Sequence, residues 1–445
     1  MASSRIRKLV WAALGAGAGA VVISSRKRRR YSLQDKVVLI AGGSRGLGLV
    51  LAREFSKRGC KVAVCARNDD ELARVRDEFA PLGERFAAGR CDLRDTDEVG
   101  ALVDAVERRL GPIDLLVNCA GTIQVGPMEN MQLEDFRAAM ETNFWSAVHT
   151  TLAVYPRMQE RRTGRIANIT SIGGKIAVPH LVPYSASKFA LVGFSKGARA
   201  ELKKDGICVT TVVPGLMRTG SARNVDTAGK HRLEYSWFML SDSIPGLSMD
   251  ARRAARKIID ACVAGRGEVT LGMPAKLIAK TEALAPNAFE SLLAMANEWF
   301  LPSPEKANGQ KKKGFESENS WTNNFVTRLT RKAERQNNQV PRERQESETE
   351  VREWTAMGRA KNRAESQSTA GARAAVSAQT QVALAQDARN AVEAEVLDNP
   401  GDPSVRPLTP ECRKCGQTFS TEAELMEHAK TCKGGNGPEV GAHFQ

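Results

Sequence analysis

The sequence predicts an α/β fold built on a doubly wound parallel sheet with helices on both faces. Short runs rich in β-branched residues alternate with longer helical patterns from Gln34 onward. These strand runs are apolar throughout, as expected of strands buried on both faces. The chain of 445 residues is 42% hydrophobic and can bury a sizeable core, whereas its 5% aromatic and 26% charged content exclude a collagen-like fibre, a disulfide-dense miniprotein and a polytopic membrane protein.

The alternation places seven strands and six helices in the first two thirds of the chain. The strands are expected at 36–41, 61–66, 88–91, 115–119, 165–169, 207–213 and 268–271. The helices are expected near 47–58, 70–80, 95–110, 133–160, 184–205 and 250–264. Because ligands of such folds bind beyond the carboxyl ends of the strands, the chemistry is expected in the loops that follow them.

Composition divides the chain into six segments. They are a basic and apolar amino-terminal helix at 1–30, the α/β domain at 34–275, an apolar helical extension at 276–304, a polar and largely disordered linker at 305–410, a small metal-binding unit at 411–433 and a tail at 434–445. The linker is too poor in apolar residues to offset the entropy lost on ordering it. The extension is expected to form one or two amphipathic helices that pack over the sheet, with contact to a membrane as the alternative.

The amino terminus holds eight Lys and Arg residues and no acid, in a chain of net charge +14. Its uncharged run at 9–23 would reach only about 22 Å as a helix, against a hydrocarbon core of roughly 30 Å. Flanking cations can extend such a helix, so a retained membrane anchor facing the cytoplasm is the favoured interpretation. A soluble or peripheral helix and a cleaved signal peptide are the alternatives, and the five cations at 26–30 oppose export.

The first expected strand leads into a glycine-rich turn with the sequence AGGSRGLG at 41–48. Gly42, Gly46 and Gly48 permit a tight turn and a close approach of the backbone to a pyrophosphate. The following helix offers its N–H groups and the positive end of its dipole to the phosphates. Such a turn is a weak signal by itself, because glycine triplets also occur by chance.

Tyr184 and Lys188 lie four residues apart, on one face of the helix expected at 184–205. The ammonium can then lie beside the phenol and lower its pKa. An unperturbed tyrosine, with a pKa near 10, is a poor base at neutral pH. An isolated pair of this kind is usually a half-buried Tyr with a Lys passing over it, so the interpretation depends on the neighbouring motifs.

Several motifs occur together in an order that resembles the short-chain dehydrogenase/reductase family over roughly 34–275. The matching residues are GGSRGLG at 42–48, Asp92, NCAG at 118–121, Asn143, Ser171, Tyr184, Lys188 and PGLMRT at 214–219. Ala41 stands where a threonine is usual, and Cys119 replaces the second asparagine of NNAG. In the family both positions support the central sheet, so these departures bear on local stability more than on activity.

The resemblance implies a role for each matching residue. Tyr184 would exchange a proton with the substrate oxygen, Ser171 would hydrogen-bond the same oxygen, and Asn143 would position a water that relays protons. Lys188 would hold the nicotinamide ribose and lower the pKa of Tyr184. Asp92 would meet the adenine, Asn118 and Gly121 the adenosine half, and Thr219 with the 214–215 turn the carboxamide. The implied cofactor-binding residues are Gly42, Ser44, Arg45, Gly46, Leu47, Gly48, Arg67, Asp92, Asn118, Gly121, Tyr184, Lys188, Pro214, Gly215 and Thr219.

The end of the second expected strand indicates NADP(H) as the cofactor. Where an acid would accept hydrogen bonds from an adenosine ribose, the chain has Ala66 followed by Arg67. An arginine fits a 2′-phosphate, and Ser44 and Arg45 could reach the same group. A solvated Arg67 without a ligand is the alternative. Since the NADP pool is usually kept reduced, reduction is the expected direction.

The substrate is expected to be an apolar or lipid-like ketone or alcohol. The segment between Thr219 and Asp250, where the family builds a lid, contains Tyr235, Trp237, Phe238, Met239 and Leu240. Ordinary packing of these side chains is the alternative. His180 is interpreted as a loop residue, because Tyr184 already fills the proton-transfer role. By analogy with the family, the helices at 133–160 and 184–205 would form a homo-oligomer.

A second motif near the carboxyl end predicts a structural Zn²⁺ site. Its four ligands, with metal-binding spacing, are Cys412, Cys415, His428 and Cys432. The segment resembles the Cys2His2 finger family with its last His replaced, and Phe419 and Leu425 supply a small core; four unrelated residues of a polar tail are the alternative. The acidic finger helix would repel phosphates, which favours a protein partner or a structural cap over nucleic acid.

The other six cysteines lie in or beside apolar runs. They are Cys60, Cys65, Cys91, Cys119, Cys208 and Cys262. This pattern is typical of reduced, buried thiols and predicts a reducing compartment.

Together these patterns predict a membrane-associated, NADP-dependent oxidoreductase acting on CH-OH groups, which transfers hydride between NADPH and an apolar ketone or alcohol. One alternative is a non-catalytic NADP-binding regulatory or scaffold protein that binds a partner through its zinc finger. The intact set of Tyr, Lys, Ser and Asn opposes that alternative. A nucleic-acid regulator is a third interpretation, which the acidic finger helix opposes.

Overall fold

The computed structural model describes residues 31–305 and 311–341, together with Gln417, Glu424, Glu427 and His428. The expected anchor at 1–30 and three of the four expected zinc ligands, Cys412, Cys415 and Cys432, lie outside the described residues. The chain divides into two units, 1–350 and 351–445, and the fold below belongs to the first. In the described part of the chain, no helix has both the length and the apolar character needed to cross a membrane.

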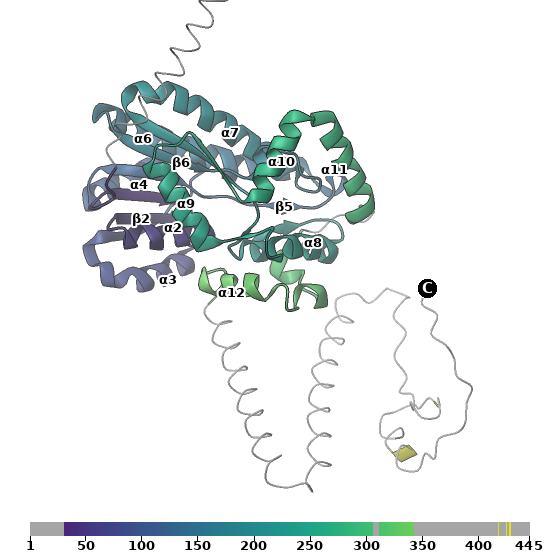
Figure 1. The fold of residues 1–445 in the computed structure, drawn as a ribbon. Coiled ribbons are helices and arrows are strands. Elements are labelled where there is room, and N and C mark those ends of the chain that lie inside the picture. The colour runs from purple at the N-terminus through teal and green to yellow at the C-terminus, as the bar shows by residue number, and fades with distance from the viewer. Residues whose placement is uncertain (1–30, 306–310, 342–416, 418–423, 425–426, 429–445) are drawn as a thin grey trace, which may run out of the picture. The chain divides into compact units, whose positions relative to one another are not determined.

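A seven-stranded parallel sheet forms the centre of the domain, as the sequence predicts (Figure 1). Its strands are β1 (Val37–Ala41), β2 (Lys61–Ala66), β3 (Phe86–Arg90), β4 (Ile113–Asn118), β6 (Gly164–Ile169), β7 (Ile207–Pro214) and β11 (Glu268–Leu271). Their order is β11-β7-β6-β4-β1-β2-β3. The direction of winding reverses between β1 and β4, which opens a crevice for ligands beyond the carboxyl ends of these two strands.

Helices cover both faces of the sheet because its strands are apolar on both sides; every residue of β1 is buried. One face packs against α2 (Gly46–Lys57), α3 (Asp69–Phe79) and α9 (Ala251–Val263). The other face packs against α4 (Thr96–Leu110), α6 (Ser146–Glu160) and α7 (Val182–Leu202). The side chains of Asn68, Asp95 and Asp250 cap the first turns of α3, α4 and α9, which explains where these helices begin.

The helix expected at 133–160 is divided into α5 (Leu133–Met140), a π-helical turn at Glu141–Trp145 and α6. Asn143 lies in this turn and is buried. Single π turns are rare and often occur at functional sites. The sequence carries no signal for the turn, because the residues on either side of it keep an ordinary helical pattern.

An accessory region lies between β7 and α9. It contains β8 (Met217–Arg218), paired with β10 (Met249–Asp250), a 3₁₀ turn at Ser221–Asn224, β9 (Asp226–Thr227) and α8 (His231–Ser243). β9 is the middle strand of a small sheet, between β5 (Gln124–Val125) and β12 (Lys312–Lys313). The accessory region therefore joins the loop after β4 to a part of the chain beyond residue 310.

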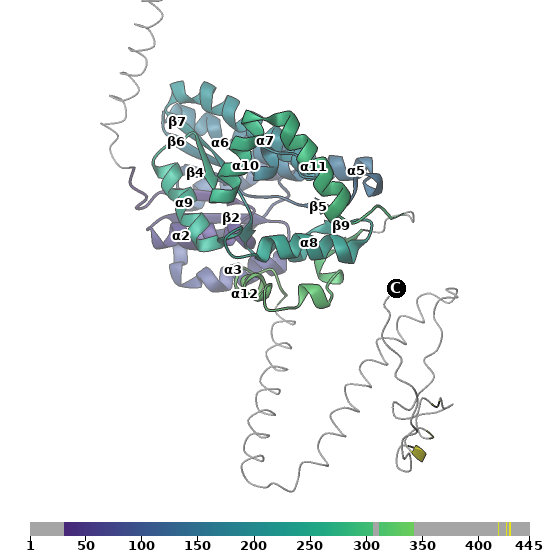
Figure 2. The same cartoon turned by 45° about the vertical axis from the view of Figure 1, so that its right-hand side comes forward.

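The apolar extension forms two helices, α10 (Met273–Leu284) and α11 (Pro286–Phe300), which lie side by side (Figures 1 and 2). They differ from the expectation of a cover packed over the sheet. Only Ala275 and Phe289 are buried in them. Their exposed apolar side chains are Met273, Leu277, Leu284, Leu292, Met295, Trp299 and Phe300. The physical reason is that six other helices already occupy both faces of the sheet.

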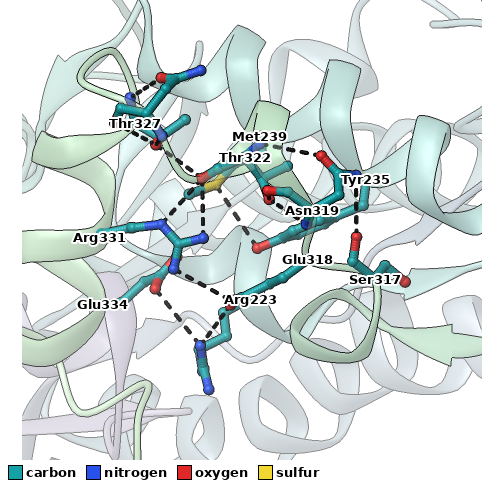
Figure 3. Close-up of polar contacts among 11 residues, drawn as sticks. Arg223, Tyr235, Met239, Ser317, Glu318, Asn319, Thr322, Thr327, Arg331 and Glu334 are labelled. Atoms are coloured by element: carbon teal, nitrogen blue, oxygen red, sulfur yellow. Dashed lines mark hydrogen bonds and ion pairs between the residues drawn. The ribbon is translucent and has the colours of Figure 1, made fainter. Parts of the chain in front are cut away.

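Residues 311–341, which we call the strap, are folded onto the accessory region instead of forming part of a disordered linker (Figure 3). The strap contains β12, 3₁₀ turns at Gly314–Glu316 and Ser320–Thr322, and α12 (Arg328–Gln336). Its polar groups bond to one another. Thr327 Oγ1 donates to the Thr322 carbonyl at 2.9 Å, and Arg331 donates to the same carbonyl and to Glu318. Satisfied hydrogen bonds and ion pairs order this stretch despite its few apolar residues.

Candidate active site

A cavity of about 560 Å³ lies beyond the carboxyl ends of β1 and β4. Twelve of the predicted site residues line it: Gly42, Ser44, Arg45, Gly46, Leu47, Gly48, Arg67, Asp92, Gly121, Tyr184, Lys188 and Thr219. Five others do not line it: Asn118, Asn143, Ser171, Pro214 and Gly215. The fold thus gathers residues separated by more than a hundred positions, because parallel strands end at the same edge of the sheet.

The glycine turn forms a wall with no room for side chains. A Cβ at Gly42 would lie 2.6 Å from the backbone of Ala120, and a Cβ at Gly48 would overlap the carbonyl oxygen of Gly42. Gly42 also has a φ of +85°, which glycine adopts at little cost. The N–H groups of Leu47 and Gly48 lie in the first turn of α2, where the helix offers no acceptor. This geometry suits a phosphate group.

Tyr184, Lys188 and Ser171 come together where β6 ends beside α7. Tyr184 and Ser171 share a side-chain hydrogen bond. Lys188 Nζ lies 5.7 Å from the centre of the Tyr184 ring and donates to the carbonyl of Ile169 at 3.2 Å. Ser171 Oγ accepts a hydrogen bond from the Gly173 N–H at 3.0 Å, which fixes its orientation. The three side chains therefore lie close together at this edge of the sheet.

Burial sets the protonation state of Tyr184. Desolvation raises the pKa of its phenol to about 12, the hydrogen bond with Ser171 lowers it, and the charge of Asp242 raises it further. Desolvation also lowers the pKa of Lys188 to about 8. The structure thus contradicts the expectation that Lys188 makes Tyr184 acidic. At neutral pH, Tyr184 is a phenol that can donate a proton.

Asn143 fixes the loop after β4 to α7. Its Oδ1 accepts from the N–H of Thr122 at 2.9 Å, and its Nδ2 donates to the Thr122 carbonyl at 3.0 Å and to Ser187 Oγ at 2.9 Å. A Cβ at Gly121 would lie 2.9 Å from Asn143 Oδ1 and 3.5 Å from Lys188 Nζ. Asn143 is therefore a positioning residue in this structure, and its predicted role in holding a water stays a prediction.

Asn118 lies beneath the cavity and supports the sheet. Its Nδ2 donates to Asn168 Oδ1 at 2.8 Å, and its Oδ1 accepts from Thr150 Oγ1 at 2.7 Å. Cys119 and Ala120 line the cavity in its place. The predicted contact between Asn118 and the adenosine half is thus replaced by a structural role, because both ends of its amide are already bonded within the fold.

The turn at 214–215 also lies away from the cavity. A Cβ at Gly215 would lie 2.8 Å from the Cβ of Ala275, so the turn packs against the first residues of α10. Thr219 does line the cavity, and its Oγ1 donates to Ser221 Oγ at 2.9 Å. Of the motif at 214–219, only Thr219 is therefore placed to contact a ligand directly.

Charged side chains gather at the end of β2. Arg67 is exposed and lines the cavity. Ser44 Oγ donates to Glu71 Oε2 at 2.6 Å, and Arg45 donates to Glu71 Oε1 at 3.1 Å. Glu71 lies in the first turn of α3 and also lines the cavity. Ser44 and Arg45, two of the three side chains predicted to bind a 2′-phosphate, are therefore hydrogen-bonded to the carboxylate of Glu71.

Asp92 lines the cavity as a paired carboxylate. Arg94 donates to both of its carboxylate oxygens, with distances of 2.5 to 3.0 Å. These hydrogen bonds lower the pKa of Asp92 to about 2. Asp92 is thus ionised throughout the neutral range and held in one orientation.

The aromatic residues of α8 pack inside the protein and do not line the cavity as a lid. Tyr235 and Met239 are fully buried, and with Phe238 they form an apolar cluster around the accessory region. Glu234 Oε2 accepts from Trp237 Nε1 at 2.7 Å, and His180 Nδ1 lies 2.9 Å from both Glu234 oxygens. The aromatic side chains of α8 thus serve ordinary packing, which was the alternative to a substrate lid. His180 is a loop residue that contacts this helix through Glu234.

Comparison with known proteins places the chain in one family. Residues 36–229 match the family model for short chain dehydrogenase. The "Dehydrogenase/reductase SDR family protein 7-like" of Anopheles gambiae is 38% identical over 212 residues, which cover 46% of this chain and 67% of that protein. The chain belongs to the short-chain dehydrogenase/reductase family. It is accordingly an oxidoreductase by family.

Two further proteins are similar to this chain. The ketoacyl reductase HetN of Nostoc sp. is 35% identical over 196 residues, covering 44% of this chain and 68% of that protein. A crystal structure of a short-chain dehydrogenase from Streptomyces avermitilis superposes with a TM-score of 0.50 at 28% identity, covering 59% of this chain and 97% of that one. The parallel sheet described above is thus the fold of the family.

The residues present fit the dinucleotide that a short-chain dehydrogenase/reductase is expected to bind. Leu47 and Gly48, in the first turn of α2, line the cavity with the glycine turn, and the cavity extends from Arg67 to Tyr184. No comparable fit exists for a metal among the residues that the structure describes, where no group of three or more His, Cys, Asp or Glu side chains could hold an ion. Of the predicted zinc ligands, only His428 is described.

The six cysteines expected to be reduced are free thiols. Burial raises the pKa of five of them to about 12: Cys60, Cys65, Cys91, Cys119 and Cys262. They therefore stay protonated and unreactive at neutral pH.

Sequence reasoning missed several polar residues that line the cavity, among them Glu71, Lys313 and Gln339. Glu71 could have been found from its position, since it lies four residues after Arg67, in the first turn of α3. Lys313 and Gln339 belong to a polar stretch without any motif, so no pattern marks them.

Proposed function

We propose that the chain uses NADPH to reduce an apolar or lipid-like ketone to an alcohol. The observation that carries this proposal is the half-buried Tyr184, which lines the cavity beside Ser171 and whose pKa of about 12 keeps the phenol protonated. Carbonyl reduction needs a proton on the substrate oxygen, and a positioned phenol can supply it as a general acid. NADPH, when bound, supplies the hydride for the carbonyl carbon.

The side chains around Tyr184 would act together on the substrate oxygen. Ser171 Oγ, held by the Gly173 N–H, donates a hydrogen bond to that oxygen, and Tyr184 donates its proton as negative charge develops there. Burial makes the phenol a weak acid. Lys188, whose pKa is about 8, is mainly cationic at neutral pH and would hold the hydroxyl groups of the nicotinamide ribose beside Tyr184.

The charge at the end of β2 supports a preference for NADPH. Arg67 is exposed there and lines the cavity, so its guanidinium can pair with a 2′-phosphate. Arg45 adds a second cation on the glycine turn once it leaves Glu71. An NADH-specific site would instead place its acid at the end of the strand, where this chain has Ala66 and Arg67.

Apolar surface beside Tyr184 supports an apolar substrate. Tyr184, Ile123 and Val178 pack against the apolar cluster of the accessory region, and Ile123 and Val225 also line the cavity. The relative HetN is by its name a ketoacyl reductase, which agrees with a ketone as substrate.

A panel of ketones and acyl carbonyls, incubated with the purified full chain and NADPH, tests the proposal through the loss of NADPH absorbance. For a substrate that turns over, Tyr184→Phe is expected to lower kcat by roughly 10²- to 10⁴-fold, the usual contribution of a general acid. NADPH affinity should stay nearly unchanged. Tyr155→Phe, in the middle of α6, is the matched control. Retained turnover in Tyr184→Phe would refute the assigned proton donor, and NADPH binding without any turnover would favour the non-catalytic scaffold.

We also propose that the chain forms a homo-oligomer through its helices. Trp145, Leu152 and Phe189 are exposed on the π turn, α6 and α7, which correspond to the helices expected, by analogy with the family, to form an oligomer. Light scattering of the purified chain should then give a multiple of 48.4 kDa. A Leu152→Glu variant should shift the mass toward the monomer, and a wild-type monomer would oppose the proposal.

The membrane anchor and the zinc finger remain proposals, because they rest on segments outside the described residues. Deleting residues 1–30 should release the protein from membranes, and a wild-type chain that is already soluble would oppose the anchor. Elemental analysis should find one zinc per full chain, and a Cys412→Ser/Cys415→Ser variant should lose it. Zinc retained by that variant would oppose the finger and the protein contact assigned to it.

A further inference from the structure

The strap borders the cavity beside the glycine turn. The carbonyl of Asn337 accepts from the N–H of Gly46 at 2.9 Å, and Asn337 Nδ2 donates to the carbonyl of Thr219 at 3.1 Å. One residue of the strap thus joins the two loops that would enclose a pyrophosphate. The N–H group of Gly46 is therefore already hydrogen-bonded. The donors that the first turn of α2 leaves for a phosphate are the N–H groups of Leu47 and Gly48.

The next residue fixes the strap on the adenosine side of the cavity. Asn338 Nδ2 donates to the carbonyl oxygens of Ser44 at 2.8 Å and Glu71 at 3.1 Å, and its Oδ1 accepts from Arg74. Asn338 has a φ of +59°, a conformation that asparagine tolerates better than most residues. This turn of the backbone directs the following residue into the cavity.

Gln339 lines the cavity and is oriented by its neighbours. Its Oε1 accepts from Asn224 Nδ2 at 2.6 Å, which fixes the amide so that Nε2 faces the glycine turn. A Cβ at Gly46 would lie 2.9 Å from Gln339 Nε2, so this amide nitrogen lies close to the glycine turn. An amide nitrogen is a donor, and the cavity wall that it faces is the one suited to a phosphate.

A network at the other end of the strap holds this arrangement in place (Figure 3). Arg223 pairs with Glu318 at 2.9 Å and lies 3.9 Å from Glu334. A Cβ at Gly220 would lie 2.5 Å from the Cα of Glu334, so α12 sits directly on this loop. Because α12 is anchored in this way, Gln339 stands on a fixed element, which suits a residue that positions a ligand.

We propose that Gln339 is a cofactor-binding residue that donates a hydrogen bond from Nε2 to the pyrophosphate of the dinucleotide. The proposal rests on the function proposed above, and it extends the binding site to a segment well beyond the residues 36–229 that match the family. The Gly46 N–H donates to the carbonyl of Asn337 and so cannot bind a phosphate. The Gln339 amide would supply a neutral donor to the phosphates at this point.

Calorimetric titration of the full chain with two ligands tests this assignment. NADPH contains the pyrophosphate, whereas adenosine 2′-phosphate lacks it and reports only on the Arg67 side. Gln339→Ala is expected to raise the Kd for NADPH about tenfold, as for the loss of a hydrogen bond to a charged group, and to leave the Kd for adenosine 2′-phosphate unchanged. Gln336→Ala is the matched control, because Gln336 is exposed on the same strap. It should change neither Kd.

A second variant and the thermal unfolding midpoint separate binding from folding. Gln339→Glu keeps the shape of the side chain and places a carboxylate against the phosphates, so it should weaken NADPH binding more than Gln339→Ala does. Equal NADPH affinity in the wild-type chain and both Gln339 variants would overturn the assignment. Tighter binding by Gln339→Ala would also overturn it, since the side chain would then be an obstruction. A wild-type chain that binds no NADPH would instead defeat the proposed function itself.

Discussion

Glu71 accepts hydrogen bonds from Ser44 and Arg45, two side chains that would otherwise bind the 2′-phosphate of NADPH. A Glu71→Gln variant is therefore expected to bind NADPH more tightly than the wild-type chain. In the structure, Glu71 accepts from Ser44 Oγ at 2.6 Å and from Arg45 at 3.1 Å. A bound 2′-phosphate must displace this carboxylate from at least one of them. A glutamine keeps the shape of the side chain and one acceptor but removes the negative charge.

The size of the effect follows from the exposure of the groups involved. Arg45 is 39% exposed, so its ion pair with Glu71 contributes only about 0.5 kcal/mol. The bond from Ser44 has a charged acceptor and contributes about 1.5 kcal/mol. If the substitution releases most of this energy to the ligand, about 1.4 kcal/mol, then the Kd for NADPH falls about tenfold. NADH has no 2′-phosphate and should gain nothing.

Fluorescence titrations with NADPH and NADH measure the two dissociation constants. Asp70→Asn is the control, because Asp70 is exposed in the same helical turn and its substitution changes the net charge equally. The expected result is a tenfold tightening for NADPH in Glu71→Gln alone. An equal gain in Asp70→Asn would reduce the effect to long-range charge. Weaker NADPH binding, or an equal gain for NADH, would refute the competition between Glu71 and the 2′-phosphate.

Three further predictions concern cofactor choice, catalysis and stability. Arg67→Ala should raise the KM for NADPH far more than that for NADH in steady-state assays; equal increases would remove the 2′-phosphate argument. Because the pKa of Lys188 is about 8, kcat/KM for NADPH-dependent reduction should fall as the pH rises past 8, and a profile that is flat to pH 10 would contradict its cationic role. Burial raises the pKa of Glu334 from 4.5 to about 7, so the folded protein favours the protonated carboxyl group. The contribution of this group to the stability of the fold is therefore complete below pH 4.5 and is lost as the pH rises through 7. Urea unfolding measures the free energy of unfolding of Glu334→Gln and of the wild type at both ends of this range. From pH 4.5 to pH 8, the difference between the two should change by on the order of 3 kcal/mol in favour of the variant. Parallel pH profiles would disprove this.

The sheet was predictable because its signals are local. The strands read from apolar runs agree with the structure to within about two residues at most ends, for example 61–66 for β2 and 268–271 for β11. Caps such as Asp95 and Asp250 mark helix starts in the sequence itself. The glycine turn and the Tyr184 and Lys188 pair were found because their spacing along the chain reflects their geometry in the cavity.

What the sequence could not supply depends on contacts between distant segments. The pKa of Tyr184 is set by how completely the fold buries it, and spacing from Lys188 says nothing about that. α10 and α11 are apolar enough to suggest packing, yet the sheet has no free face for them. The strap is polar enough to suggest disorder, yet its partners, such as Arg223 for Glu318, lie about a hundred residues away.

Ser44 and Asn338 are hydrogen-bonded although 294 positions separate them along the chain. A ribosome adds about 5–20 residues per second, so the glycine turn emerges roughly 15 to 60 s before the residues that close over it. The nascent protein can build its sheet during this interval, but its nucleotide cleft still lacks one wall. A premature stop codon anywhere ahead of position 337 would leave that wall missing for the lifetime of the molecule.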